Sequence, residues 1–267
     1  MVVSPYRLHL SQTQLNLLSV CPRKYQHTYL EQLGLSLDAD QQEKRQLGEQ
    51  FHQLMQQHLL GLNIEPLLQA EPALVDYFQA FLRSQSEIVP TEADAYRQSE
   101  CSVSIEFQGY LLTAVYDLLI TGLAEARILD WKTYPKPLQA RKLIENWQTR
   151  LYLFVLAEAS GYEPEQLSMT YWFFQAAGDR EAQKLHLPYS KKQHEQTYAD
   201  LTQQLDQLTL WLEQYNQGVD FPQVPTASTY CPSCHFAVRC DRPIPASEAQ
   251  SELTVIPDLT TIQEIPI

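Results

Sequence analysis

Two carboxylates and a lysine stand at the ends of two apolar runs in the middle of the sequence. Asp117 closes the first run, and Asp130-Trp131-Lys132 closes the second. Mg²⁺ and Mn²⁺ prefer carboxylate and carbonyl oxygens, and a lysine beside such an ion can stabilise the negative charge that develops when a phosphoester is attacked. These residues therefore indicate a divalent-metal hydrolase site, although the short pattern Asp-x-Lys also occurs by chance in many soluble proteins.

A group of cysteines near the C-terminus could hold a second metal. Cys231, Cys234 and Cys240 lie within one short segment, and three thiols are one too few for a closed tetrahedral site. Cys21 is the natural fourth ligand, because a proline follows it, as a proline follows Cys231, and because it lies at a predicted junction between two helices. Such a site would be a clasp between the N-terminal helix and the C-terminal segment, and its binding free energy would contribute to folding.

Several interpretations of the cysteines stay open. His235 and Cys101 compete with Cys21 as the fourth ligand, although Cys101 falls on the apolar side of a predicted strand, where a free cysteine acts as a small hydrophobic residue. Four thiolates can hold zinc or a [4Fe-4S] cluster, and the ligand set alone does not separate the two. The remaining alternative is a set of unrelated thiols. A disulfide framework is not expected in a cytosolic chain.

Two pairs of residues spaced four apart fall on predicted helices. Gly48-x-x-x-His52 places a histidine on one helix face, and Gln148-x-x-x-Tyr152 places an amide beside a phenol on another, because residues four apart are neighbours on a helix. A lone histidine in such a position is more often a packing residue than a metal ligand. The glutamine and tyrosine predict either a buried hydrogen-bonding network or contacts with a substrate phosphate or base.

Strands that would position these residues are predicted from the alternation of apolar and polar side chains. Residues from Ser99 to Phe107 alternate, and Gln108-Gly109 follows them. Since glycine supplies the positive φ that a two-residue turn needs, this segment predicts a β-hairpin, which a third strand extends to a meander. The third strand and two further strands are predicted over residues 126–131, 169–174 and 185–187.

Helices are predicted where apolar residues recur at helical spacing. Ser11 is a suitable N-cap for a first short helix, and Pro22 can begin a second. Longer helices are predicted over residues 47–59, 73–85, 143–159 and 190–217. Helices followed by three antiparallel strands, a buried helix, a strand and a long helix are typical of an α/β core with N- and C-terminal additions.

Composition and charge bound the class of protein. The chain has 267 residues, 44% of them hydrophobic, so we expect one domain over residues 1–243, followed by a disordered acidic tail over 244–267. No apolar run is long enough for a membrane span or a secretory signal, and a cytoplasmic protein with no membrane contact is expected. The net charge of -13 argues against a surface that attracts nucleic acid uniformly.

The order of all these motifs resembles that of the PD-(D/E)xK nuclease superfamily. Within it, the pattern is similar to the group that includes the nuclease domain of the bacterial RecB helicase-nuclease. The cysteines are similar to those of its iron-sulfur members, such as the AddB subunit and the CRISPR-associated adaptation exonucleases. The resemblance covers about Leu10 to Cys240 and departs from the family where Ala114-Val115-Tyr116, rather than a glycine, precede Asp117. The motifs in their order are His52, Glu100 before a strand, Asp117, Asp130-x-Lys132, Gln148-x-x-x-Tyr152 and four cysteines.

The resemblance implies a restriction-endonuclease-like α/β core, with a central mixed sheet that contains the three-strand meander. It implies that Lys132 orients or activates the attacking water and stabilises the negative charge that develops on the phosphate. It also implies that Gln148 and Tyr152 support the active site and contact DNA. The implied ligands of Mg²⁺ or Mn²⁺ are His52, Asp117, Asp130 and the Trp131 carbonyl. The implied ligands of a [4Fe-4S] cluster, which the resemblance favours over zinc, are Cys21, Cys231, Cys234 and Cys240.

The function that follows from the resemblance is metal-dependent cleavage of DNA. We expect an exonuclease on single-stranded or frayed DNA ends, in DNA repair, recombination or related processing. The chain contains no helicase motif, so any unwinding would need a helicase or another protein partner. The alternative is a non-catalytic module that binds DNA or a partner on a nuclease fold.

Overall fold

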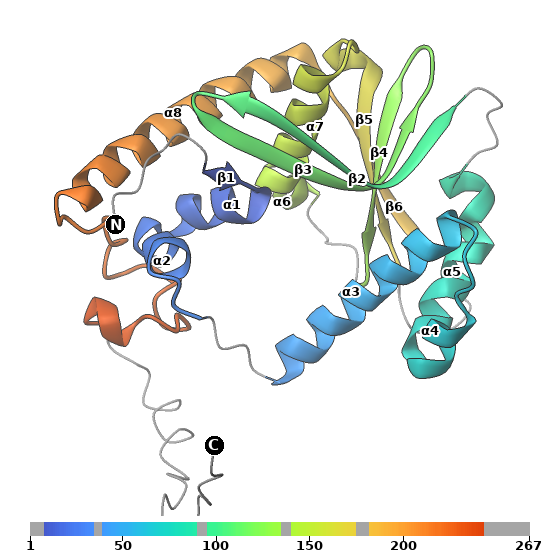
Figure 1. Ribbon diagram of the computed structural model, residues 1–267, viewed down its shortest axis with the longest axis horizontal. Coiled ribbons are helices and arrows are strands. Elements are labelled where there is room, and N and C mark those ends of the chain that lie inside the picture. The colour runs from blue at the N-terminus through green and yellow to red at the C-terminus, as the bar shows by residue number, and fades with distance from the viewer. Residues whose placement is uncertain (1–7, 35–38, 90–94, 135–139, 175–181, 243–267) are drawn as a thin grey trace, which may run out of the picture.

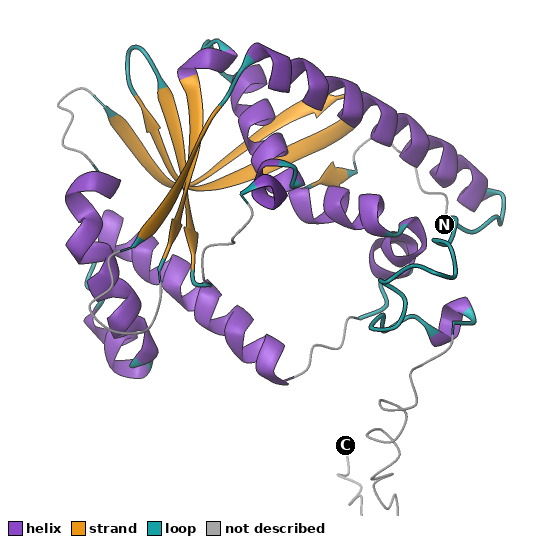
Figure 2. Cartoon of the chain, turned by 180° about the vertical axis from the view of Figure 1, so that it is seen from behind, coloured by secondary structure: helices purple, strands orange, loops and turns teal. Residues whose placement is uncertain are grey.

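The computed structural model describes residues 8–34, 39–89, 95–134, 140–174 and 182–242. A six-stranded mixed sheet forms the centre of this part of the chain, and helices cover both of its faces (Figures 1 and 2). The predicted tail over 244–267 lies outside the described residues. The strands are β1 (His9–Leu10), β2 (Tyr96–Phe107), β3 (Tyr110–Thr121), β4 (Ala126–Lys132), β5 (Leu167–Phe173) and β6 (Gln183–Pro188). The α-helices are α1 (Gln12–Val20), α2 (Pro22–Tyr25), α3 (Ala39–Leu59), α4 (Glu65–Ala70), α5 (Ala73–Ile88), α6 (Arg141–Ile144), α7 (Trp147–Ala159) and α8 (Lys191–Asn216).

The central strand β3 carries the branch point of the sheet. β2 pairs antiparallel with it along one edge. The other edge is shared, because β1 pairs with residues 111–112 and β4 pairs with residues 118–121. Among the described strands, none covers this edge of β3 over residues 113–117. β3 and β4 therefore separate next to Asp117. Beyond this point β4 stays in the sheet through its parallel pairing with β5.

The predicted meander and the α/β architecture are confirmed. Gln108 and Gly109 have φ values of 51° and 80°, and two successive positive φ angles are those of the tight turn that suits the twist of a hairpin. The predicted strands over 169–174 and 185–187 correspond to β5 and β6, which pair antiparallel. None of the helices in the described ranges is long and apolar enough to cross a membrane.

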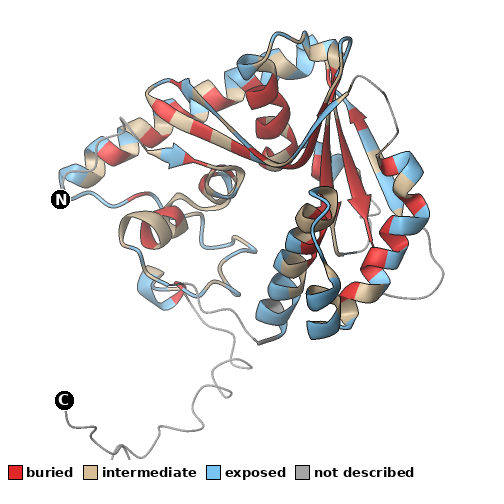
Figure 3. Ribbon diagram, turned by 45° about the vertical axis from the view of Figure 1, so that its right-hand side comes forward, coloured by how far each residue is buried: buried red, intermediate tan, exposed pale blue. Residues whose placement is uncertain are grey.

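Two hydrophobic cores lie on the two faces of the sheet. The first is covered by α1, α7 and α8, and the second by α3 and α5. α7 is buried around most of its circumference because it contacts strands of the sheet on one side and α8 on the other (Figure 3). α8 packs on the core mainly through one stripe of leucines, which are fully buried, while most residues on its other faces are polar.

The side chains of β3 change faces at Asp117. The even-numbered residues from Tyr110 to Tyr116 point into the first core, whereas Leu118 and Ile120 point into the second. Residues two apart normally share a face of a strand, so the strand turns over at this point. On β2, Glu100 lies opposite Asp117 and has a φ of 49°, a left-handed conformation that is unfavourable for residues other than glycine.

Some expectations from the sequence were wrong. Asp117 does not end a strand, because β3 continues to Thr121 with the buried residues Leu118–Ile120. The helix predicted over 143–159 is divided into α6 and α7, since the Asn146 side chain accepts a hydrogen bond from the Gln148 amide and caps a new helix there. β1, α4 and a π-helical turn over Gln26–Leu30 were not predicted, because such short elements have no measurable periodicity.

Candidate active site

His52, Glu100 and Asp117 meet where the sheet opens. One nitrogen or oxygen atom from each lies within 4.8 Å of the other two, and His52 Nδ1 is 3.1 Å from Asp117 Oδ1. α3 brings the histidine there because its neighbours Phe51 and Met55 are fully buried in the second core. Two carboxylates and an imidazole from three different elements thus form a compact set of donors.

Asp117 also binds the backbone of β4 just beyond the residues of β4 that pair with β3. Its Oδ2 accepts a hydrogen bond of 2.6 Å from the backbone N–H of Trp131. The N–H and the C=O of one residue in a strand point to the same side, and the next carbonyl, that of Lys132, points the other way and accepts from Phe174. The Trp131 carbonyl therefore faces the opening between β3 and β4, on the side of Asp117.

Asp130, Lys132 and Gln148 form a second group next to the first. Lys132 Nζ lies 2.6 Å from Asp130 Oδ2 and donates to Gln148 Oε1 at 3.1 Å. Gln148 Nε2 donates to the other carboxylate oxygen of Asp130 at 2.7 Å. The Asp130 side chain is 2% exposed and that of Lys132 is 14% exposed. Each of the three side chains fixes the other two, so the lysine ammonium is held in one position.

The protonation of this group follows from its burial. Burial raises the pKa of the Asp130 carboxyl to about 6, against the opposing effect of Lys132 and with a further increase from Asp117. Burial alone would lower the pKa of Lys132, but the charge of Asp130 outweighs it, and the pKa lies above its ordinary value. Lys132 is therefore an ammonium ion near neutral pH, suited to donating hydrogen bonds and not to accepting a proton.

The charges around Glu100 and Asp117 fit a divalent cation. Burial raises the pKa of Glu100, and repulsion from Asp117 raises it further. Burial opposes protonation of His52, but its hydrogen bond to Asp117 and the nearby carboxylates leave the pKa above its ordinary value. Carboxylates and imidazole are ligands of Mg²⁺ and Mn²⁺. A cation among them would relieve the repulsion between the two carboxylates and displace the histidine proton.

Tyr152 lies one helical turn after Gln148, beneath the same site. Its ring packs edge-on against Tyr116 with ring centres 5.4 Å apart. Burial, reinforced by the charge of Asp130, raises the pKa of Tyr152 to about 12. The phenol therefore stays protonated beside the Gln148 side chain.

The predicted site residues thus fall into two adjoining groups. Asp117 joins His52, while Asp130 is engaged with Lys132 and Gln148. Glu100 had been placed in the motif order from the sequence, but without a role as a ligand. The signal that could have identified it is the hairpin register, since a two-residue turn at 108–109 places Glu100 directly opposite Asp117.

The four cysteines named as ligands line one cavity of about 130 Å³ between the α1–α2 junction and the C-terminal segment. Of the two competitors, Cys101 is buried in the first core, and His235 is exposed and does not line this cavity. In a closed zinc site with bonds of about 2.3 Å, the sulfur atoms are about 3.8 Å apart. In the described part of the chain, however, no three cysteine sulfurs lie within 4.8 Å of one another, so the thiols are spaced more widely than zinc requires.

Comparison with known proteins places this geometry in a family. Residues 9–241 match the model described as the PD-(D/E)XK nuclease superfamily. The chain belongs to this superfamily. The match confirms the family predicted from the order of the motifs, and a divalent metal site is what a PD-(D/E)XK fold implies.

One solved structure shares the fold of this member of the PD-(D/E)XK superfamily. A protein of Eubacterium rectale described as a "Putative exonuclease" matches with a TM-score of 0.56 and 10% identity, over 92% of this chain and 94% of that chain. The protein SSO0001 matches with 14% identity and a TM-score of 0.39, over 90% of this chain and 88% of that chain. A search of the curated proteins gave no match.

Proposed function

We propose that this PD-(D/E)XK nuclease is a divalent-metal-dependent deoxyribonuclease, which removes nucleotides from single-stranded or frayed DNA ends in repair, recombination or related processing. The observation that carries the proposal is the convergence of His52, Glu100 and Asp117 next to a fixed lysine ammonium. The fold shared with the protein described as an exonuclease supports the class of reaction.

Each side chain has a distinct part in the proposed reaction. His52, Glu100, Asp117 and the Trp131 carbonyl would hold Mg²⁺ or Mn²⁺, and Asp130 completes this set if it turns one oxygen away from Lys132. The ion, when bound, supplies a Lewis acid for the phosphate and lowers the pKa of water. Lys132 donates a hydrogen bond to a phosphate oxygen and stabilises the charge that develops on it.

The remaining two residues keep the lysine in place. Gln148 bridges Asp130 and Lys132, and Tyr152 lies one helical turn after Gln148 on the same face of α7. Since a displacement of about 1 Å can cost a large part of a rate enhancement, these two residues act mainly by positioning the ammonium. They also lie where a base or phosphate of the substrate would approach.

The charge of the chain favours a partner that delivers the substrate. At a net charge of -13, long-range electrostatics slow the encounter with DNA. A helicase or another DNA-binding protein in the same complex would present a single strand directly to the site, and such a partner belongs to the proposal.

The four-cysteine cavity is proposed to hold a [4Fe-4S] cluster, as in the RecB-like iron-sulfur group that the chain resembles. Thiolates are the ligands of such clusters. The four thiols that line the cavity are the ligands that such a cluster needs, and the resemblance to the iron-sulfur group favours a cluster over a single zinc ion. Bound there, the cluster supplies no step of DNA cleavage and ties α2 to the C-terminal segment.

Cleavage of end-labelled DNA tests the nuclease proposal. With Mn²⁺ or Mg²⁺ we expect labelled single strands to be shortened from an end, a closed single-stranded circle to resist, and chelation of the metal to stop the reaction. Cleavage of the circle would contradict the exonuclease. Binding of DNA without cleavage at any metal concentration would contradict catalysis and favour a non-catalytic binding module.

Replacement of Glu100 tests the composition of the metal site. We expect Glu100→Gln to weaken Mn²⁺ binding by at least about 10-fold, because it removes one charged ligand. Even the loss of a residue that only hydrogen-bonds to a metal ligand commonly has an effect of this size. Calorimetric titration with Mn²⁺ alone measures the affinity. Glu195→Gln is the matched control, since Glu195 is exposed on α8, which covers the other face of the sheet. Equal affinities for Glu100→Gln and the wild type would remove Glu100 from the ligands.

A further inference from the structure

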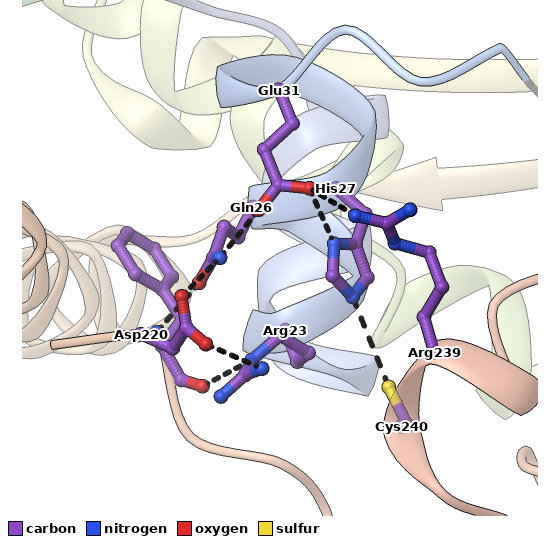
Figure 4. Close-up of polar contacts among 8 residues, drawn as sticks. Arg23, Gln26, His27, Glu31, Asp220, Arg239 and Cys240 are labelled. Carbon is purple, nitrogen blue, oxygen red and sulfur yellow. Dashed lines mark hydrogen bonds and ion pairs between the residues drawn. The ribbon is translucent and has the colours of Figure 1, made fainter. Parts of the chain in front are cut away.

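A buried histidine in the π-helical turn after α2 contacts Cys240, one of the four cysteines that line the cavity. The His27 residue is 4% exposed. Its Nδ1 lies 2.8 Å from Glu31 Oε2, and its Nε2 lies 3.9 Å from Cys240 Sγ (Figure 4). None of the motifs recognised in the sequence includes this histidine, and the proposed nuclease reaction does not use it.

The surroundings of His27 hold it in one orientation. The ring packs against Phe236 with ring centres 5.1 Å apart. Its partner Glu31 is itself fixed, because the Gln26 side chain donates to Glu31 Oε1 at 2.6 Å and Arg239 lies 3.8 Å from Oε2. π-Helical turns are rare and occur frequently at functional sites, and this one places consecutive side chains, Gln26 and His27, on the same carboxylate.

The same turn is joined to the C-terminal segment by other buried contacts. Gln26, which is 1% exposed, also donates to Asp220 and accepts from the backbone of Phe221. Arg23 pairs with Asp220 at 3.0 Å and donates to the Phe221 carbonyl (Figure 4). The position of His27 relative to the segment that carries Cys240 is therefore set by several bonds other than its own.

In this geometry His27 contacts a proposed metal ligand, Cys240, and would not contact the metal itself. Histidines and carboxylates that orient ligands strongly affect metal affinity, and hydrogen bonds to ligand sulfurs change the potential of iron-sulfur centres. The ring meets Glu31 through Nδ1 and the Cys240 sulfur through Nε2, so an N–H at Nε2 points toward that sulfur.

We propose that His27, oriented by Glu31, is a positioning residue that donates a hydrogen bond to the Cys240 sulfur in the metal-bound protein. This inference rests on the proposed metal binding by the four cysteines. The hydrogen bond stabilises negative charge on the sulfur. It therefore slows the loss of metal from the site and favours the reduced state of a cluster, which carries one more electron.

Three full-length variants test the role of the ring. His27→Phe keeps a flat ring but removes both nitrogens, His27→Gln keeps a side-chain donor, and Glu31→Gln removes the charge that orients the histidine. His194→Phe is the matched control, because His194 also pairs with a carboxylate, Glu158 at 3.0 Å, but lies in α8, and none of its described contacts is with a cysteine.

The measurements use metal bound to the cysteines and not nuclease activity. Retention of iron, and of Co²⁺ loaded in place of iron, is measured by competition with a chelator, and the reduction potential by a redox titration. We expect His27→Phe to retain metal about 10- to 100-fold less well and its cluster to have a more negative potential. Glu31→Gln should change both in the same direction, His27→Gln should recover part of the loss, and His194→Phe should equal the wild type.

Several results would overturn the inference. If the wild type binds metal and His27→Phe retains it equally well at an unchanged potential, His27 has no such role, while the cysteine site stands. If His27→Gln loses as much metal as His27→Phe, a side-chain donor at this position does not restore metal retention, and the proposed hydrogen bond to Cys240 is contradicted. If the wild type binds neither iron nor Co²⁺ through its cysteines, both the proposed metal site and this inference are wrong.

Discussion

Lys132→Met is expected to slow DNA cleavage by at least about 100- to 1,000-fold, the effect of removing one preorganised donor to the transition state. Methionine has a similar length and no charge, so the change removes the ammonium that contacts Asp130 and Gln148. Rates are measured on single-stranded DNA in a single turnover at saturating Mn²⁺, so that weaker substrate binding does not hide the effect on the chemical step.

The same substitution leaves a buried charge without its partner, which must be separated from the loss of activity. Asp130 is 2% exposed, and removing one member of a buried ion pair costs about 3–5 kcal/mol. The double variant Asp130→Asn/Lys132→Met removes both charges and should recover much of this stability without recovering cleavage. An exposed lysine at the start of α8, Lys192, gives the control Lys192→Met. A cleavage rate of Lys132→Met within about threefold of the wild-type rate would contradict the proposal that Lys132 stabilises the transition state.

Cys21→Ser is expected to release the metal of the cysteine site and to lower the melting temperature by at least about 10 °C, since the binding free energy of such a site contributes directly to folding. Cys21 is the ligand that comes from the N-terminal helices, while the others come from one C-terminal segment. Its loss therefore opens the link between these parts as well as the site. Iron and zinc analysis of anaerobically purified protein, together with thermal unfolding, measures both effects.

The fifth cysteine provides the control for this experiment. Cys101 is buried in the first core and does not line the cavity, so Cys101→Ala should keep the metal content of the wild type. Brown protein that contains iron supports the cluster. Zinc in equal amount to protein, with no iron, would contradict the cluster and leave a zinc clasp. Unchanged metal content and stability in Cys21→Ser would contradict the clasp altogether.

The fold could be predicted where a segment has one regular period and one buried face. β2 alternates cleanly from Cys101 to Phe107, and α8 repeats its leucines on one stripe, so both were found from the sequence. β3 was found only in part, because a carboxylate in an apolar run looks like the end of a strand. Its side chains change faces at Asp117 through pairing with different strands on either side, and this information is not local.

The candidate site divides in the same way. Asp117, Asp130 and Lys132 were identified because their types and spacing carry a recognisable pattern. The role of Glu100 depends on register across the hairpin, and that of His27 on contact with a segment 213 positions away. Asn146 divides a predicted helix through one side-chain hydrogen bond. A single bond of this kind is not visible in the periodicity of the apolar residues.

The wide separation of His27 and Cys240 has a consequence for synthesis of the chain. The two residues are 213 positions apart, and at about 5–20 residues per second a ribosome needs about 10–40 s to pass from one to the other. During that time Cys21 has been synthesised, but the segment with Cys231, Cys234 and Cys240, which completes its cavity, has not. A nascent chain released between residues 152 and 231 would contain every residue of the candidate active site but not Cys231, Cys234 and Cys240, so the metal proposed for the cysteine site could be loaded only after residue 240 has been made.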